Sequence, residues 1–252
     1  MPVNFTLFDI SAGLIDQWRE AFTVLVPAEC RARVVIVHGG ISDLHPPFDL
    51  HRIACQLLRE VRWRVSWTSR YFLLPPSQYW HHISFDQVLS DRLSPPTVPD
   101  ALTRVAQRVI YDRWRGYAPP GTCTLLPLSG TPCAGNPFSC RYVALCPTMR
   151  LPSSVVWHKE IVYNCVWSLL VEIDHHNARA AVDPRLHPIR SVVMTGIGTG
   201  IGRIPPKQCA KQTALAFAHY HAAKTRVATW STMTWADIEQ YPLNVRLPSD
   251  AY

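Results

Sequence analysis

Four glycines at alternate positions form the segment of this chain best suited to bind a ligand through its backbone. They are Gly196, Gly198, Gly200 and Gly202. Glycine has no Cβ and tolerates positive φ angles, so a charged group can come close to main-chain N–H donors. Such donors, at the start of a helix, suit a phosphate group. The spacing therefore predicts a loop that holds a phosphate.

The elements predicted on either side place this loop between a strand and a helix. Residues 189–194 favour a buried strand, and residues 207–223 favour a helix that follows Pro205 and Pro206. The amino end of that helix would add free N–H groups and the positive end of its dipole. A tight turn whose glycines serve packing alone is the alternative interpretation of the same residues.

Familiar motifs that could explain these glycines differently do not fit. The dinucleotide-binding pattern needs G-x-G-x-x-G, but its third glycine would fall on Ile201 or Arg203. The segment also lacks the Gly-Lys-Ser/Thr ending of a nucleoside triphosphate-binding loop. The run His38-Gly39-Gly40 resembles the oxyanion loop of an α/β-hydrolase, yet the chain contains no G-x-S-x-G. The glycine loop is therefore neither a standard dinucleotide turn nor a triphosphate loop.

Charge and hydropathy limit the classes of partner. The 252 residues include 25 Lys and Arg against 18 Asp and Glu, a formal net charge of +7 that favours anionic partners. The basic residues are scattered, so we do not expect a nucleic-acid groove. The chain starts without a signal-peptide pattern, and its longest apolar stretch, 161–171, is interrupted by Asn164 and Ser168. We expect an intracellular protein without a membrane span.

The eight cysteines show no C-x-x-C pair and no regular disulfide framework, so we expect reduced thiols in the core. Cys133, Cys140 and Cys146, with His158 downstream, could form a metal site on paper. Their spacing matches no zinc motif. We therefore expect neither a metal nor a cofactor.

Hydrophobic periodicity predicts strands and helices that alternate along the chain. Strands are expected at 5–8, 33–37, 64–68, 122–126, 141–146 and 189–194. Helices are expected at 12–26, 50–60, 99–111, 159–174 and 207–223. This alternation predicts an α/β fold with a largely parallel sheet and helices on both faces. Ligands in such folds bind beyond the carboxyl ends of the strands, where the glycine loop would lie.

Residues 192–220, with the glycine loop, Pro205-Pro206 and an alanine-rich helix, resemble the carboxyl-terminal part of a macrodomain. The segment Cys-Pro-Thr-Met-Arg-Leu-Pro at 146–152 resembles an element of a divergent macrodomain branch. The similarity runs from about Gly121 to Tyr220 and faintly back to Phe5. It implies a three-layer α/β/α fold with a mixed, largely parallel sheet over residues 1–225, and an aromatic-rich extension, 226–252, that packs on it.

The resemblance also implies a ligand, ADP-ribose or a related nucleotide, and some family members remove ADP-ribose from targets. The ligand contacts expected on this basis come from Gly196, Ile197, Gly198, Thr199, Gly200, Ile201, Gly202, Ile41, Ser69 and Thr148. In that picture the glycine loop wraps the diphosphate.

Two departures from the family pattern bear on this expectation. Gly40 stands where an aspartate commonly reads adenine, unless Asp43 substitutes, and Ser69 stands where an asparagine positions the distal ribose. Candidate acid–base groups for hydrolysis are Asp86, His81 and His82, and the sequence leaves catalysis open. The alternative is a domain that has lost nucleotide chemistry and binds a protein partner.

Overall fold

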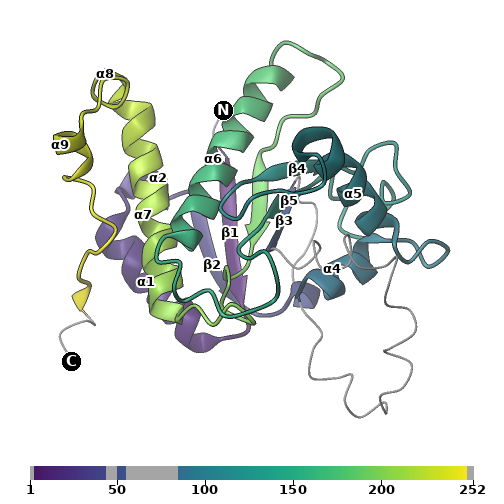
Figure 1. Cartoon of the computed structure of the whole chain (residues 1–252), viewed down its shortest axis with the longest axis horizontal. Coiled ribbons are helices and arrows are strands. Elements are labelled where there is room, and N and C mark those ends of the chain that lie inside the picture. Colours follow the sequence, from purple (N-terminus) through teal and green to yellow (C-terminus); the bar gives the residue numbers. More distant parts are fainter. Residues whose placement is uncertain (1–2, 44–49, 55–84, 249–252) are drawn as a thin grey trace.

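Within the residues that the computed structural model describes, 3–43, 50–54 and 85–248, six strands form one sheet (Figure 1). In chain order they are β1 (Asn4–Asp9), β2 (Val34–His38), β3 (Leu50–Ala54), β4 (Thr124–Pro127), β5 (Tyr142–Cys146) and β6 (Ser191–Met194). Their spatial order is β2-β1-β6-β3-β5-β4, and every neighbouring pair is parallel except β4 and β5. The predicted α/β class with a largely parallel sheet is confirmed.

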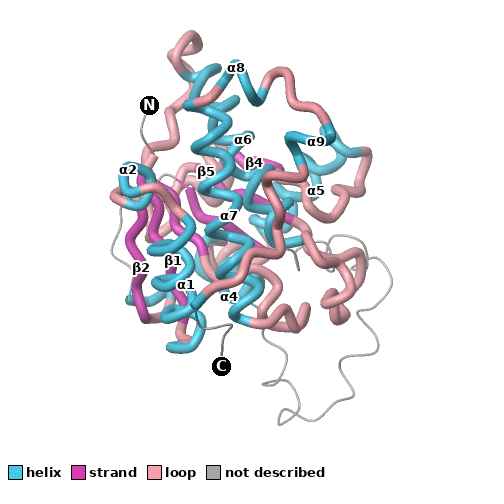
Figure 2. The backbone as a smooth tube through the Cα atoms, turned by 90° about the vertical axis from the view of Figure 1, so that its left-hand side faces the viewer, coloured by secondary structure: helices cyan, strands magenta, loops and turns pink. Residues whose placement is uncertain are grey.

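Helices cover both faces of this sheet, because its strands are apolar on both sides (Figures 1 and 2). One face packs against α1 (Ala12–Leu25), α6 (Ile161–Ala180) and α7 (Pro206–Thr225). The other packs against α4 (Phe85–Leu93) and α5 (Ala101–Trp114). The shorter elements are α2 (Ala28–Arg31), the 3₁₀ helix η1 (Ile41–Asp43), α8 (Val227–Trp230) and α9 (Trp235–Ile238).

Alternation of side chains along β1 shows how one strand serves both layers. Leu7 is fully buried against α1 and α7, while its neighbour Phe8 lies in the cluster that includes α4 and α5. Helix α1 presents Leu14, Ile15 and Trp18 to the first cluster at helical spacing. The Ser11 hydroxyl caps this helix by accepting the N–H of Leu14 at 3.4 Å.

The predicted helix at 50–60 is wrong where the structure describes it. Residues Leu50–Ala54 form β3, which lies in the middle of the sheet and pairs with β5 along its whole length and with β6 at its start. Two parallel neighbours supply this segment with hydrogen-bond partners, and such long-range pairing overrides local propensity. Residues 55–60 and the strand predicted at 64–68 lie outside the described residues.

The cysteines behave as the sequence predicts where they can be seen. Seven of them take part in no disulfide within the described residues, and all of these except Cys30 are buried. The described residues contain no group of His, Cys, Asp or Glu side chains arranged to hold a metal ion. None of the helices in the described ranges combines the length and apolar character that crossing a bilayer requires.

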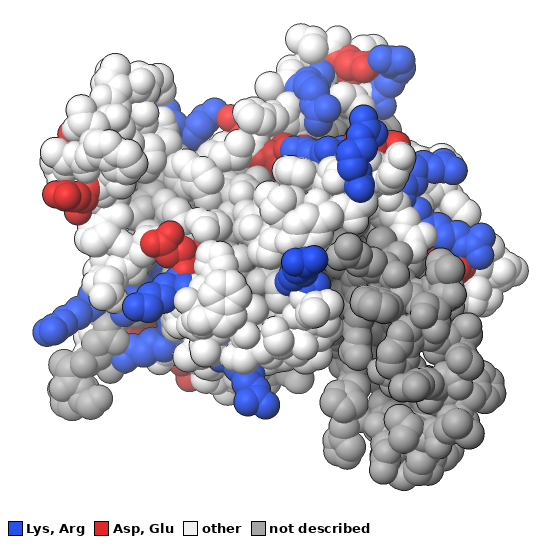
Figure 3. Space-filling model, in the orientation of Figure 1, with Lys and Arg blue, Asp and Glu red and all other residues white. Residues whose placement is uncertain are grey.

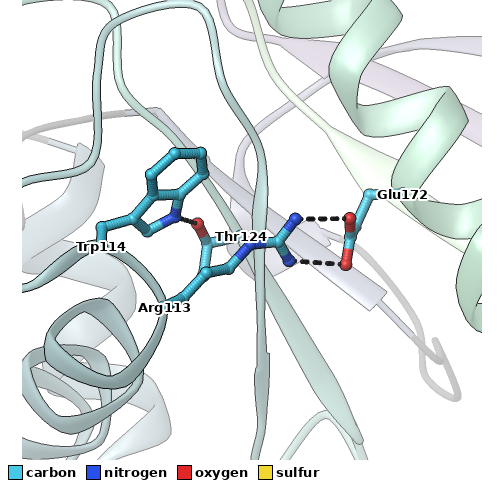
Figure 4. Close-up of polar contacts among 4 residues, drawn as sticks. All are labelled: Arg113, Trp114, Thr124 and Glu172. Atoms are coloured by element: carbon cyan, nitrogen blue, oxygen red, sulfur yellow. Dashed lines mark hydrogen bonds and ion pairs between the residues drawn. The ribbon is translucent and has the colours of Figure 1, made fainter.

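A bidentate ion pair joins α5 to α6 across the β4 edge of the sheet (Figure 4). The Arg113 guanidinium donates to both carboxylate oxygens of Glu172 at 2.8 and 3.0 Å, and the Glu172 side chain is only 10% exposed. Beside it, the Trp114 indole N–H donates to the Thr124 hydroxyl at 2.8 Å. The pair satisfies a carboxylate that faces the protein interior.

Replacing Arg113 with alanine should lower the free energy of unfolding by about 2 kcal/mol, because Glu172 would lose its charged donor. Since the Arg113 side chain is 43% exposed, solvent keeps the loss below that of a fully buried pair. The double variant Arg113→Met with Glu172→Leu should regain most of this stability. Chemical denaturation measures all three proteins, and an unchanged midpoint for Arg113→Ala would contradict the assignment.

The segment after α7 packs back on the domain through an aromatic cluster of Tyr163, Trp167, His219, Trp230 and Tyr241. Trp230 stacks on Trp167 with ring centroids 5.6 Å apart and also contacts Tyr241 at 4.9 Å. Residues of α6, α7 and α8 therefore share one cluster. The predicted domain boundary at residue 225, with an extension packed on the domain, stays a prediction.

Burial at this cluster links stability to pH. His219 is buried, its Nδ1 lies 3.1 Å from the Tyr163 hydroxyl, and burial lowers the pKa of His219 from its ordinary value of 6.5. Burial also raises the pKa of Tyr163 to about 12, so this hydroxyl stays neutral. The unfolded chain consequently binds a proton at position 219 more tightly than the folded chain does.

Stability should therefore fall as the pH drops from about 7 to about 5, and His219→Phe should reduce that slope. Hydrogen bonds lower the pKa values of Glu29, Asp183 and Asp237, and the substitution at position 219 leaves these three groups in place. Their contribution should thus be the same in both proteins. Unfolding free energies measured across the window test this, and equal slopes for wild type and variant would refute a role for His219.

Candidate functional site: the glycine loop

The glycine loop, residues 195–205, connects the buried strand β6 to α7. It lies at the carboxyl end of the parallel strands, near the lower edge of the view in Figure 1. Pro205 is the N-cap residue of α7, and no side chain caps this helix end. The first turn also contains no acidic residue. The positive end of the α7 dipole therefore faces the loop without a compensating carboxylate from that turn.

Three carbonyl groups of the loop accept hydrogen bonds, two from the loop itself and one from the segment after β5. The N–H of Ile204 donates to Gly198 O at 3.0 Å, and the N–H of Arg203 donates to Gly200 O at 2.9 Å. The N–H of Val155 donates to Gly202 O at 2.9 Å. These three bonds hold the backbone of the loop in place.

The backbone N–H groups of residues 198–202 are the next feature of the loop. Across the described part of the chain, no acceptor is recorded for the backbone N–H groups of residues 198–202. The N–H of Ile197, just before them, donates to the Cys209 sulfur at 3.4 Å. A run of consecutive backbone donors ahead of a helix start is the arrangement that binds anions.

Three of the four glycines are required by the loop itself. A Cβ at Gly202 would lie 2.5 Å from Gly198 O, and one at Gly196 would lie 2.5 Å from the Leu14 side chain. Gly198 has φ +67°, a left-handed conformation, and a Cβ there would lie 3.0 Å from Ile204. The packing interpretation therefore accounts for these three positions.

Gly200 differs from the other three. It is exposed, and a Cβ added to it would meet no atom within 4 Å. Packing does not explain a glycine here, whereas a ligand resting on the bare backbone would. Packing therefore explains Gly196, Gly198 and Gly202, whereas the ligand-binding interpretation explains Gly200.

The side chains of the loop anchor it in the core. Ile197 is 1% exposed, and Ile201 is partly buried against the same cluster. Both isoleucines were expected as ligand contacts, but these side chains face the protein, and of the two backbone N–H groups that of Ile197 already donates to Cys209. For these two residues, the side chains are thus part of the packing and not of the exposed surface of the loop.

Thr148, on the segment after β5, lies beside the glycine loop. Its side chain is 3% exposed, and its methyl group lies 3.9 Å from the position of a Cβ at Gly198. Val155 continues the same segment, and its side chain lies 3.1 Å from a Cβ position at Gly202. The segment after β5 therefore forms one wall of the loop.

Asp9, at the end of β1, ties the glycine loop to the neighbouring strand ends. Its Oδ2 accepts the Thr195 hydroxyl at 3.0 Å, and its Oδ1 accepts the N–H of Ser11 at 2.9 Å. Its carbonyl accepts the N–H of Gly39 at 3.0 Å. Sequence reasoning missed this residue, although an aspartate between a strand and an N-cap serine is a readable signal for such a junction.

The segment after β2 is not joined to the glycine loop by any recorded contact between described residues. Ile41, an expected ligand contact, is 7% exposed and lies in the core cluster of α4 and α5. Asp43, the candidate substitute for the adenine-reading aspartate, accepts the N–H of Gly40 at 2.7 Å through Oδ2. This carboxylate is therefore engaged in its own turn.

The remaining expected residues lie where the structure gives no description. Ser69, His81 and His82 fall outside the described residues. Asp86 lies in α4, whose backbone is described there, but its side chain is not. The expected contact at Ser69 and the three acid–base candidates thus stay predictions.

Charge around the site is moderately basic. Arg203 and Lys207 flank the start of α7, and Arg203 is exposed with φ +56°. On the face shown in Figure 3, Lys and Arg side chains are dispersed among neutral and acidic ones. The local charge suits a small anion better than an extended polyanion.

Comparison with solved structures matches the chain to a point mutant of the Oceanobacillus iheyensis macrodomain, at 12% sequence identity and a TM-score of 0.44. The match covers 70% of this chain and 71% of that chain. No protein-family model matches the chain, and no curated protein does.

Proposed function

We propose that this chain is a macrodomain-like protein, a three-layer α/β/α sandwich, that binds ADP-ribose or a related phosphate-containing nucleotide. The observation that carries the proposal is the run of backbone N–H groups at 198–202 without an acceptor among the described residues. These donors precede the uncapped amino end of α7. A diphosphate offers the oxygens and the negative charge that such a cradle lacks.

The energetics favour a charged ligand at this position. A hydrogen bond to a charged group contributes roughly 1.5–3 kcal/mol, so two or three bonds from the loop would supply much of a micromolar affinity. A neutral sugar or base alone would gain less from the same donors. The phosphate, rather than the base, is therefore expected to dominate binding.

Thr148 and Ser69 complete the proposed site together with the loop backbone and the residues around Ile41. Thr148 lies against Gly198, where its hydroxyl could meet a phosphate or ribose oxygen. Removal of ADP-ribose from a target would require an acid–base group beside the distal ribose, for which Asp86, His81 and His82 are the candidates. Binding is the function proposed here, with hydrolysis as an extension of it.

A domain that binds a protein partner and no nucleotide is the second candidate. It is favoured by the Asp43 carboxylate, which accepts the N–H of Gly40 instead of facing the glycine loop. Nucleotide recognition would then lack a base-reading carboxylate from the segment after β2. The two candidates make opposite predictions for ligand binding.

Isothermal titration calorimetry with ADP-ribose, AMP and ribose 5-phosphate separates them. The proposal expects saturable binding of ADP-ribose with weaker binding of the two monophosphates, because each offers the loop fewer phosphate oxygens. Absence of heat with all three ligands at high protein concentration, from protein shown to be folded, would favour the partner-binding candidate.

A further inference from the structure

Strand β2 forms one edge of the sheet and pairs with β1 alone among the described strands (Figure 2). The N–H of Phe5 donates to Arg33 O, and the N–H of Gly39 donates to Asp9 O. These two bonds show which residues of β2 are hydrogen-bonded to β1. The odd-numbered residues of β2 therefore direct their N–H and C=O groups to β1. The even-numbered ones direct theirs away from the sheet.

Three residues consequently present both backbone groups at the open edge. They are Val34, Ile36 and His38, and no described residue supplies their N–H or C=O groups with a partner. The apolar run 34–37 contains no proline, lysine or acidic residue of the kind that protects natural edge strands. Val35 leaves 58% of its surface exposed. As far as the described residues go, the backbone groups of this edge are available to another strand.

We propose that this edge binds the β2 strand of a second copy of the chain, antiparallel across a two-fold axis at Ile36. This register pairs Val34 with His38 of the second copy and Ile36 with itself, giving up to about six backbone hydrogen bonds. It also sets Val35 directly against Val37 of the second copy, as an apolar pair. The interface is isologous, as a two-fold dimer requires.

Charge complementarity at both ends of the strand supports a second copy as the occupant. The same register puts Arg33 opposite Gly39 of the second copy. A Cβ at Gly39 would lie 3.1 Å from the Asp43 Oδ2, so this carboxylate occupies the space of a side chain at Gly39. Side chains directly opposite in an antiparallel pair project to the same face. Arg33, which has no recorded ion pair among the described residues, would therefore meet Asp43 of the second copy.

Sedimentation velocity over a concentration series reaching the micromolar range tests the assembly. The sedimentation coefficient of the wild type should correspond to a dimer, twice the 28.5 kDa mass of one chain. That of Val35→Lys should correspond to the monomer. The lysine would face Val37 of the second copy and lose hydration there. Val182→Lys is the matched control, because Val182 is 84% exposed and far from β2 in the sequence, and it should leave the dimer intact.

Arg33→Glu tests the charge contact independently. It would set a carboxylate opposite Asp43 at both ends of the interface and should weaken association about tenfold. Arg31→Glu makes the same change in net charge two residues away, where the guanidinium donates to Thr23 O at 2.8 Å. It should weaken association far less. Equal effects of the two variants would overturn the proposed register.

Cysteine cross-linking reports the register directly and does not depend on the lysine variant. Ile36→Cys should form an intermolecular disulfide on mild oxidation, because residues paired across an antiparallel ladder lie within disulfide range. Val35→Cys should not, since position 35 faces position 37 of the second copy. A wild type that stays monomeric throughout, or a dimer that persists in Val35→Lys and does not cross-link at 36, overturns the proposal.

Discussion

Leucine at position 200 is expected to abolish nucleotide binding while leaving the fold intact. Gly200 is exposed, and a Cβ there meets no atom within 4 Å, so the larger side chain has room in the free protein. The same side chain would occupy the space in front of the unused N–H groups. Loss of two charge-assisted hydrogen bonds, at roughly 1.5–3 kcal/mol each, should weaken ADP-ribose binding at least about 100-fold.

Calorimetry and thermal unfolding on the same samples check both halves of this expectation. Gly135→Leu is the matched control, because Gly135 is also an open glycine but lies in the segment between β4 and β5. It should bind ADP-ribose as wild type does. A Gly200→Leu protein with unchanged affinity, or one whose stability falls by more than about 1 kcal/mol, contradicts the distinction drawn between the glycines.

Alanine at position 202 should have the opposite effect and destabilise the fold. Its Cβ would lie 2.5 Å from Gly198 O and 3.1 Å from both Gly198 Cα and a Val155 methyl group. Two of these three atoms belong to the backbone, so no rotamer change relieves the contact. Overpacking of this kind costs roughly 1–3 kcal/mol, and we expect a loss toward the upper end of that range.

Denaturant unfolding measures this loss as a lower midpoint with an unchanged slope. Gly200→Ala provides the control, because it adds the same methyl group to the same loop in open space and should change stability by less than about 0.5 kcal/mol. Equal stabilities of the two alanine variants would show that the contacts at Gly202 do not constrain the loop.

The fold was predictable wherever the hydrophobic pattern was local and strong. Helix α7 differs from the prediction by two residues at most, and β1, β2 and β5 by one or two. Strand β3 could not be recognised, because its hydrogen bonds come from β5 and β6, more than 80 residues downstream. Its own residues, Leu-His-Arg-Ile-Ala, show no clear strand period. Tertiary pairing decided its conformation.

The site was predictable in position more than in detail. Alternate glycines between an apolar strand and a helix were enough to place the loop at the carboxyl edge of the sheet. The sequence could not distinguish Gly200 from Gly196, Gly198 and Gly202, since only contacts separate an open glycine from a crowded one. Asp9 was missed for a similar reason, because its partner Thr195 lies 186 residues away in the chain.

The claim that the loop N–H groups bind phosphate can be tested at those groups. Titration of ¹⁵N-labelled protein with ADP-ribose should shift the amide resonances of residues 198–202 most strongly, and Gly135 should stay unchanged. The amide of Ile197, already bonded to Cys209, should move less than those that follow it. If ADP-ribose binds and shifts resonances elsewhere but leaves the amide resonances of residues 198–202 unchanged, the claim that these N–H groups bind phosphate is wrong.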